Sequence, residues 1–409
     1  MTQYHVTKGI LECSKRNTLI ISYFNKILKY GCFVGVFWVF LSYNYRCFTG
    51  VNWVFSMKTI KNHVLTGEQV NQITKIERFQ GAFETTKFQR PALVESLKKT
   101  SIITSSGAST RIEGAILADE QVKELVEKGC EINDMSSRSE REVAGYVKTL
   151  NYIYDNFEKL DVSEKMIREL HQLLTSELTE DQLPSTQRGA YKDVPNDVVE
   201  QDQATGKIIK VWFKTAPPGL ETETAMADLI SDYVQMKKAK ECQPLILIAG
   251  FIVHFLAIHP FRDGNGRLSR LLTTILLLKN GYKWAQYTSH EKVIEDNKEG
   301  YYTSLRNTQS TFHEEAQYNY WISYFLKVLT VQTDFLNSKL IHKSPASVMN
   351  DNEKQVYSII EAEEECKISF ILDNVDMSRD GLKDLLKRLV DKGIIKKKGQ
   401  GRGTTYVIG

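Results

Sequence analysis

Most of the side chains that could do chemistry together lie in a run of twelve residues, 259–270, which reads HPFRDGNGRLSR. His259 could take a proton from a hydroxyl group, because an imidazole titrates near neutral pH. Asp263 is the type of ligand that holds Mg²⁺ beside nucleotide phosphates. Arg267 and Arg270 are three residues apart, so on a helix they share one face and can bind an anion together. These residue types predict a site for a chain of phosphates.

Two strongly apolar stretches must position this run. Residues 244–258 precede it and residues 271–282 follow it, and both are long and apolar enough to be buried helices. The polar segment between them is therefore a loop, in which Gly264 and Gly266 allow backbone geometries that other residues resist. The second helix is expected to begin near Asn265 or Gly266. Its free N–H groups and positive dipole end would face whatever the loop holds, which favours an anion.

The run resembles the signature of the Fic (Fido) family, His-x-Phe-x-Asp/Glu-Gly-Asn-Gly-Arg-x-x-Arg, with every defining position matched. The resemblance extends from about residue 101 to about residue 329. Fic proteins with Gly at the position of Gly266 mostly transfer AMP from ATP to a hydroxyl group of a protein. The branch with Lys there phosphorylates instead, so Gly266 argues against phosphorylation. The resemblance therefore implies a protein adenylyltransferase that uses ATP as co-substrate.

In this interpretation His259 is the general base for a Tyr, Thr or Ser hydroxyl. Asp263 holds Mg²⁺, with Mn²⁺ as an alternative metal. Backbone N–H groups near residues 264–266 and the Asn265 side chain neutralise the oxygens on which charge develops. The two arginines, Arg267 and Arg270, hold the β- and γ-phosphates.

A second group of residues, Ser109, Arg111, Glu113 and Gly114, resembles the family's inhibitory motif, Ser/Thr-x-x-x-Glu-Gly. The resemblance implies that Glu113 pairs with Arg270 and occupies the partner that the ATP γ-phosphate needs. The alternative is that Glu113 is a solvated helix charge, as most Glu residues are. Some relatives use this Glu to remove AMP with a water, so a de-adenylylating hydrolase stays an alternative. The density of Ser, Thr and Gly also predicts a break in the chain near Gly107.

Residues 181–218 read as a β-hairpin, because short β-branched runs flank a turn at residues 204–206. In the Fic family a hairpin flap stands here, covers the nucleotide and aligns the target by strand pairing. The resemblance gives the nucleotide-side strand to Trp212, Phe213, Lys214 and Thr215. An ordinary structural hairpin is the alternative.

Two aromatic residues after the signature, Tyr301 and Tyr302, are implied by the resemblance to contact the adenine, and so is Gln309. Aromatic residues at helical spacing are otherwise usually core residues. His254 lies on the apolar helix before the signature, and we interpret it as a core histidine rather than a second base.

The helical patterns predict a mainly α protein, a Fic-type helical core with a β-hairpin flap and a small C-terminal winged-helix (α+β) domain. The expected parts are an atypical extension (1–56), an N-terminal helical region (57–135), the core (136–335), a linker (336–352) and the winged-helix-like domain (353–409). In the last domain the wing is basic, with Lys396, Lys397, Lys398 and Arg402. The candidate recognition helix mixes basic and acidic residues, so binding of DNA and docking of a protein both stay open. A DNA-binding regulator whose core only senses nucleotide is the rival function.

Composition adds little to these motifs. The chain of 409 residues carries a net charge of +3, too small to argue for nucleic acid by itself. Its six Cys show no paired spacing, which favours reduced thiols in a cytoplasmic protein. The extension is basic and holds an apolar run at 31–41, too short to span a membrane. We favour a natural start at Met57, with a membrane anchor or a signal peptide as alternatives. The expected partners are ATP and an unknown protein target, with a self-modifying homo-oligomer left open.

Overall fold

The computed structural model describes residues 56–86, 91–130, 135, 137–201, 208–312, 315–341, 349–363, 365–399 and 401–408. The extension and its apolar run at 31–41 therefore lie outside the described residues. So does the turn predicted at 204–206. Within the described ranges, no helix combines the length and hydrophobicity that crossing a bilayer requires. The described cysteines, Cys130, Cys242 and Cys366, are free thiols.

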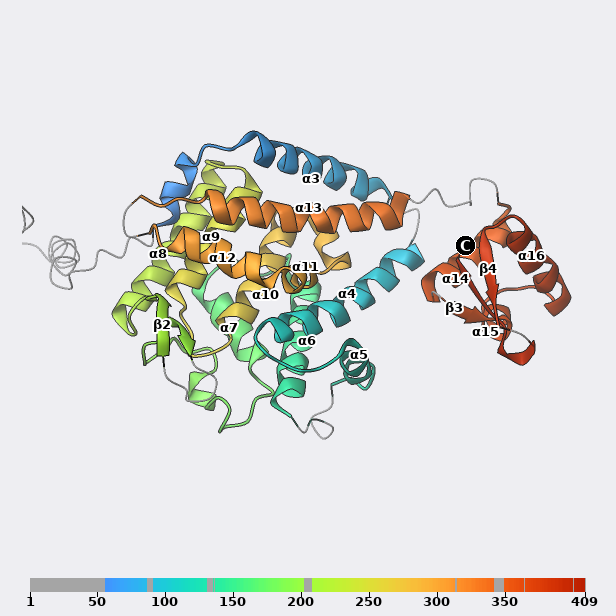
Figure 1. Ribbon diagram of the computed structural model, residues 1–409, viewed down its shortest axis with the longest axis horizontal. Coiled ribbons are helices and arrows are strands. Elements are labelled where there is room, and N and C mark those ends of the chain that lie inside the picture. Colours follow the sequence, from blue (N-terminus) through green and yellow to red (C-terminus); the bar gives the residue numbers. More distant parts are fainter. Residues whose placement is uncertain are drawn as a thin grey trace, which may run out of the picture. The chain divides into compact units, whose positions relative to one another are not determined.

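A helical body occupies the chain from Met57 to Ile341 (Figure 1). Its α-helices are α3 (Gly67–Thr86), α4 (Pro91–Ile112), α5 (Asp119–Glu127), α6 (Arg138–Asn156), α7 (Glu164–Leu174), α8 (Leu220–Ala239), α9 (Pro244–Ile258), α10 (Asn265–Lys279), α11 (His290–Asp296), α12 (Lys298–Gln309) and α13 (Asn319–Ile341). Short 3₁₀ helices are η2 (Met57–Asn62), η5 (Ser185–Gln187) and η6 (Lys283–Tyr287). The prediction of a mainly helical body is confirmed.

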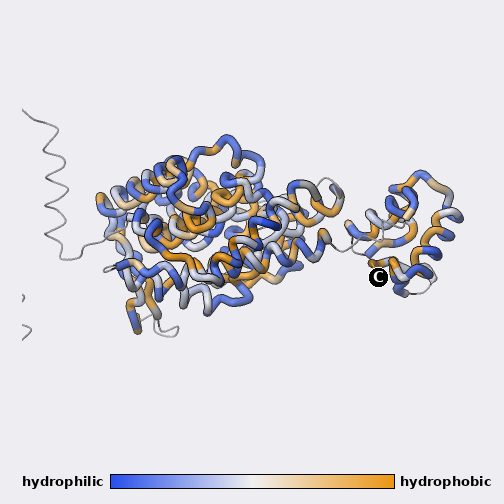
Figure 2. The backbone as a smooth tube through the Cα atoms, turned by 90° about the horizontal axis from the view of Figure 1, so that it is seen from above, coloured by the Kyte–Doolittle hydropathy of each residue, from blue (hydrophilic) through white to orange (hydrophobic). Residues whose placement is uncertain are grey.

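Helix α9 forms the core of the body. Every residue from Leu245 to Ile258 is buried, as expected for a helix that is apolar all round. It packs against α8, α10, α12 and α13, and Figure 2 shows apolar stretches in the interior of the body. The helix starts where the Gln243 side chain accepts hydrogen bonds from the next free N–H groups, with Pro244 at the first position. Because α9 is buried on all sides, the residue that follows its C-terminal end, His259, has a fixed position.

Helix α4 corrects the prediction of a break near Gly107. The helix is continuous from Pro91 to Ile112. The hydroxyl of Ser106 donates to the carbonyl of Ile102 at 2.7 Å, and that of Thr110 donates to the carbonyl of Ser106 at 2.9 Å. The buried hydroxyls are thus satisfied inside the helix. Their small size lets α4 pack closely on the body, so they do not break it.

The predicted hairpin is present. Strands β1 (Val198–Gln201) and β2 (Ile208–Phe213) pair antiparallel, with Val199 opposite Val211. They form a sheet of two strands. Because β2 ends at Phe213, the residues Lys214 and Thr215 that were expected on the strand follow it instead.

In its described residues, the C-terminal part contains three α-helices, a 3₁₀ helix and a small sheet. The elements in order are α14 (Asp351–Glu363), β3 (Glu365–Lys367), α15 (Ile368–Asp373), α16 (Arg379–Asp391), β4 (Ile395–Lys398), η8 (Gly401–Gly403) and β5 (Thr405–Ile408). The sheet order is β3-β5-β4, and both pairs are antiparallel. A mixed α+β arrangement was predicted for this part, whereas strand β3 was not. Helix takes up both ends of the predicted linker, because α13 continues to Ile341 and α14 begins at Asp351.

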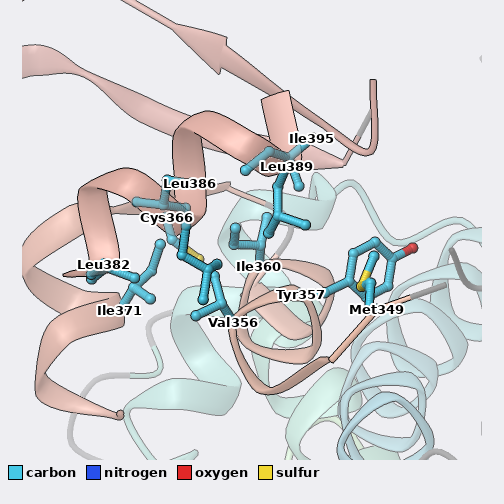
Figure 3. Packing of buried hydrophobic residues seen from close by; sticks show 11 residues of the cluster. Met349, Val356, Tyr357, Ile360, Cys366, Ile371, Leu382, Leu386, Leu389 and Ile395 are labelled. Carbon is cyan, nitrogen blue, oxygen red and sulfur yellow. The ribbon is translucent and has the colours of Figure 1, made fainter. Parts of the chain in front are cut away.

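One apolar cluster holds this part together, and Figure 3 shows its side chains meeting between the helices and the sheet. The buried members are Met349, Val356, Tyr357, Ile360, Cys366, Ile371, Leu382, Leu385, Leu386, Leu389 and Ile395. On α16, the buried residues Leu382, Leu385, Leu386 and Leu389 recur at the spacing of one helical face. The opposite face, with Lys383 and Asp380, is exposed and carries an ion pair at 3.0 Å.

Candidate active site

His259 is the residue that directly follows the buried helix α9. It adopts a left-handed backbone conformation with φ 53°. Its Nδ1 lies 3.2 Å from the carbonyl oxygen of Leu256, and because a carbonyl can only accept, Nδ1 carries the proton. In the neutral ring Nε2 is then the proton acceptor. Burial, together with the nearby charge of Lys192, lowers the pKa of His259 to about 4 against the bond to Leu256. The ring is therefore a neutral base at physiological pH.

The loop after His259 is held by its own side chains. Gly264 has φ 80° and is the residue before α10, so the first free N–H groups of that helix follow directly. The amide of Asn265 binds the backbone of Phe261 at both ends, accepting from its N–H at 2.9 Å and donating to its carbonyl at 2.6 Å. Both polar atoms of the Asn265 side chain thus order the loop. A phosphate contact was predicted for that side chain, whose two polar atoms instead bind the backbone of Phe261 here.

Asp263 is the carboxylate of the loop. Its oxygens lie 2.5 Å from Nη2 of Arg138 and 3.3 Å from Nη2 of Arg267, and it accepts from the N–H of Gly264 at 2.6 Å. Burial raises the pKa of Asp263, but Arg267 and Arg138 outweigh burial and hold it below its usual range. The group is therefore ionised, as a metal ligand must be.

A metal site made by protein groups alone is absent from the described residues, which contain no cluster of three or more His, Cys, Asp or Glu suited to an ion. Asp263 nevertheless fits the way Mg²⁺ is usually held beside nucleotides, by one or two carboxylates together with phosphate oxygens. The donor set thus fits Mg²⁺ that arrives with a nucleotide.

The two arginines of the signature are buried, each side chain 2% exposed. Arg267 pairs with Glu142, Nη1 to Oε1 at 3.2 Å, and with Asp263. Arg270 donates to the hydroxyl of Ser109 at 2.8 Å and to its carbonyl at 2.9 Å. Nε of Arg267 and Nη1 of Arg270 have no hydrogen-bond partner among the described residues. Because a buried donor without a partner costs about 1–3 kcal/mol, these groups are suited to an anion.

Glu113 reaches the signature from the turn that ends α4. Its Oε1 lies 2.8 Å from Nη2 of Arg270, so the pairing expected from the motif is present. Burial lowers the pKa of Arg270, but the charge and hydrogen bond of Glu113, with Tyr301 and Tyr146 nearby, together raise it above its usual range. The carboxylate also lies against Gly266, where an added Cβ would stand 2.1 Å from Oε1. Gly266 therefore leaves the space into which Glu113 fits.

A cavity of about 670 Å³ lies in front of these groups, within the range of small-ligand sites. It is lined by Glu113, Asn196, Asp197, Val198, Val199, Trp212, Leu256, His259, Arg262, Asp263, Gly264, Asn265, Gly266, Arg267, Tyr301, Tyr302, Leu305, Arg306 and Gln309. The cavity thus joins His259, the start of α10, both strands of the hairpin and α12. Trp212 on β2 lies between two cations, Lys210 at 3.6 Å and Arg306 of α12 at 4.7 Å from its ring centre.

The residues expected to contact the nucleotide are Tyr301, Tyr302 and Gln309, for the adenine, and the four flap residues. Tyr301, Tyr302 and Gln309 all line the cavity, although Tyr301 is also a core residue that packs edge-on against Trp321. Of the four flap residues, only Trp212 lines the cavity.

The assignment of the other three flap residues to the nucleotide side is corrected. Phe213 and Thr215 are buried in the body, and Lys214 is exposed and does not line the cavity. The reason is that strand pairing ends at Phe213, after which the chain turns back into the core. His254 is buried and contacts Tyr318 at 2.9 Å, so its interpretation as a core histidine is confirmed.

His171 on α7 was not predicted as a site residue, yet it positions the loop. Its Nδ1 accepts from the N–H of Gly189 at 2.9 Å, which leaves Nε2–H to donate to the carbonyl of Asp263 at 2.9 Å. Its ring stacks on Phe261 with centres 3.8 Å apart. Burial lowers the pKa of His171 to about 4, so the ring is neutral. No local motif marks a histidine of this kind in the sequence.

Two more residues, Lys192 and Asn196, were also missed. Asn196 donates to the carbonyls of His259 and Phe261 at 3.1 and 2.7 Å. Lys192 Nζ lies 3.0 Å from the carbonyl of Ile258. A Lys and an Asn more than sixty residues before the signature carry no spacing signal that connects them to it.

Comparison with known proteins matches part of this chain to one protein family. Residues 161–277 match the model of the Fic/DOC family. The protein adenylyltransferase Fic of Drosophila willistoni is 25% identical over 175 residues, 42% of this chain and 31% of that protein. A Fido domain-containing protein of Dictyostelium discoideum is 35% identical over 60 residues, 15% of this chain and 42% of that protein. The chain thus spans about a third of the length of the Drosophila relative.

The fold has solved counterparts. A Fic family protein from Desulfovibrio desulfuricans superposes with a TM-score of 0.54 at 20% identity, covering 85% of this chain and 97% of that one. A Fic domain containing signaling protein from Bacteroides thetaiotaomicron gives 0.50 at 20% identity, covering 71% of this chain and 98% of that one. The matched segment, the shared fold and the complete signature together support a place for this chain in the Fic/DOC family.

Proposed function

We propose that this protein transfers AMP from ATP to a hydroxyl group of a protein. One observation carries the proposal. A neutral imidazole, His259, and the buried guanidinium of Arg267 border one cavity at the N-terminus of α10, and Glu113, which also lines that cavity, is paired with the buried Arg270. That arrangement suits a phosphate chain whose α-phosphorus lies within reach of a base. The adenylyltransferase name of the Drosophila relative supports the same reaction class.

In the proposed reaction, the phosphates of ATP lie along the start of α10. The N–H groups after Gly264 and the arginines Arg267 and Arg270 bind the phosphate oxygens, and Asp263 would hold Mg²⁺ against them. The metal, when bound, would neutralise charge on the α- and β-phosphates. His259 Nε2 takes the proton of a Tyr, Thr or Ser hydroxyl as its oxygen attacks the α-phosphorus. The bond between the α-phosphorus and the bridging oxygen breaks, and pyrophosphate leaves.

We further propose that Glu113 restrains this reaction. Its carboxylate occupies Nη2 of Arg270, the donor that a γ-phosphate would use. A carboxylate and a phosphate carry the same sign of charge, so both cannot bind that guanidinium edge at once. The fit of Glu113 against Gly266, which has no side chain to exclude it, supports this role.

We also propose that the C-terminal part is a winged helix. The element order, α14, β3, α15, α16, β4 and β5, and the sheet order β3-β5-β4 support this assignment. The exposed basic strand β4, with Lys396 and Lys397, would form one side of the wing.

Radiolabelled ATP tests the proposed reaction. The protein with Mg²⁺ and cell lysate is offered ATP labelled on the α-phosphate in one tube and on the γ-phosphate in another. Transfer of AMP predicts protein-bound label from the α-position alone. Label from the γ-position alone would mean phosphorylation and would refute the proposal. Glu113→Ala is included because the restraint would otherwise suppress the signal.

A further inference from the structure

The segment between α7 and β1 binds the end of α9 in a way the proposed reaction does not yet use. Four consecutive carbonyls, residues 258–261, are all bound by Lys192 or Asn196. Lys192 Nζ lies 3.0 Å from the carbonyl oxygen of Ile258. The backbone N–H of Lys192 donates to the carbonyl oxygen of Pro260 at 2.8 Å. The Asn196 amide donates to the carbonyls of residues 259 and 261 at 3.1 and 2.7 Å.

The carbonyl of Ile258 is one of those that a helix end leaves without partners, and the other three follow it in the loop. They also belong to the backbone around His259, whose left-handed φ of 53° costs a residue with a side chain about 1–2 kcal/mol. Bonds from Lys192 and Asn196 offset that cost and hold the backbone in the strained form. The imidazole direction follows from the backbone, because the side chain is anchored to it.

The same ammonium group also reaches the hairpin. Lys192 Nζ lies 2.9 Å from the hydroxyl of Thr215 and 2.6 Å from Oδ1 of Asn196. Thr215 follows the hairpin strand β2, and its N–H donates to the carboxylate of Asp197 just before β1. One buried cation thus connects the base of the hairpin with the backbone of His259.

We propose that Lys192 is a positioning residue that, together with Asn196, fixes His259 and the base of the flap in one arrangement. The inference rests on the proposed function for its kinetic part. We expect nucleotide binding not to depend on Lys192, because the arginines Arg267 and Arg270 are held by Glu142 and Ser109 rather than by Lys192. Loss of Lys192 should therefore slow transfer and leave nucleotide affinity unchanged.

The charge of Lys192 gives a readout that packing alone would not move. The pKa of His259 is lowered to about 4, chiefly by burial; the charge of Lys192 contributes to the lowering, whereas Glu113 and Asp263 oppose it. Lys192 itself faces Asp197, and burial lowers the pKa of its ammonium to about 7. Below that pH the ammonium is charged, so removing it should raise the pKa of His259.

The test compares Lys192→Met, Lys192→Arg and, as an exposed control, Lys165→Met, each in the full chain carrying Glu113→Ala. The Lys165 side chain is 83% exposed on α7. Transfer of α-label, affinity for an uncleavable ATP analogue and the His259 pKa by NMR of isotope-labelled histidine are measured. We expect Lys192→Met to slow transfer by roughly 100-fold, as a misplaced catalytic group does. Analogue affinity should stay constant and the His259 pKa should rise.

Lys192→Arg keeps the charge, so it should restore most of the rate and the parent pKa, and Lys165→Met should match the parent. An unchanged rate and unchanged His259 pKa in Lys192→Met would overturn the inference. So would a parallel loss of rate and analogue binding in a variant that still folds, since that result means a general disturbance of the site rather than positioning of His259.

If Lys192→Met does not fold, Thr215→Val decides, because it keeps Lys192 and removes the hydroxyl that ties Lys192 and Asn196 to the end of the flap. A rate loss of about tenfold, the equivalent of one hydrogen bond, is expected, and an unchanged rate would overturn the link. If the Glu113→Ala parent itself transfers no label, the proposed function fails. The NMR measurement still tests the effect of Lys192 on His259 in that case.

Discussion

Replacing Glu113 with Ala should strengthen ATP binding. The carboxylate lies 2.8 Å from a guanidinium, Arg270, whose side chain is 2% exposed, whereas the Glu113 side chain is 33% exposed. Hydrogen bonds to charged groups contribute about 1.5–3 kcal/mol. Because solvent screens the exposed third of Glu113, the lower part of that range applies, about 1.5–2 kcal/mol. ATP has to displace this bond, so removing it should tighten binding by roughly 10- to 30-fold.

Titration calorimetry with an ATP analogue that cannot be cleaved between its α- and β-phosphates measures this gain. AMP serves as the ligand control, because it lacks the γ-phosphate that would replace the carboxylate. Glu120→Ala, at an exposed position of α5, serves as the protein control. The gain should be confined to Glu113→Ala with the ATP analogue. Equal gains for AMP would mean a loosened cavity, and no gain for the ATP analogue would refute competition at Arg270.

Three further predictions concern pH, packing and the loop. Because the pKa of His259 is lowered to about 4, chiefly by burial, its base form persists as pH falls. The rate of label transfer should therefore not decline when the pH is lowered from about 8 to about 6, whereas Lys192 only gains charge in that window. A decline centred near the ordinary histidine pKa would contradict this. Gly145→Ala should lower the free energy of unfolding in urea by roughly 1–3 kcal/mol, because its Cβ would lie 2.1 Å from the carbonyl oxygen of Leu174. The control Gly81→Ala, also in a helix, meets nothing within 4 Å and should not lower that free energy. Equal losses in the two variants would refute the packing argument. His171→Ala should slow transfer by roughly 10²-fold without changing the His259 pKa in NMR titration, and a full rate would show that the loop needs no such support.

The centre of the site could be predicted because the sequence encodes it locally. Two unbroken apolar runs flank residues 259–270, so burial of both helices fixes the loop between them. The position of Gly264 directly before α10 can likewise be read from neighbouring residues in the sequence. The pairing of Glu113 with Arg270 crosses 157 positions and came from the resemblance alone. Physical reasoning from the sequence offers no route to that contact.

The supporting residues could not be predicted, because their roles exist only in the folded chain. His171, Lys192 and Asn196 are ordinary residue types at positions without periodic meaning, and each acts by binding backbone carbonyls of the loop. Helix α4 fails in the opposite direction. Its Ser, Thr and Gly content indicates a break by local propensity, but close packing outweighs propensity and keeps the helix to Ile112.

The ends of elements were also beyond reach. The nucleotide-side strand of the flap was predicted to run from Trp212 to Thr215, because the sequence does not show that strand pairing stops at Phe213. Strand β3 spans three residues, Glu365–Lys367, and their charge favours a loop until β5 supplies a partner.

The most direct test of the central claim is the mass of an acceptor protein incubated with the enzyme, Mg²⁺ and ATP. Three forms are compared, namely the wild type, Glu113→Ala, and Glu113→Ala combined with His259→Ala. The account predicts a gain of one AMP, more with Glu113→Ala than with the wild type, and reduced by about 10²- to 10⁴-fold or more in the double variant. An added phosphate in place of AMP would contradict the account. An AMP adduct that persists at the full rate without His259 would contradict it too.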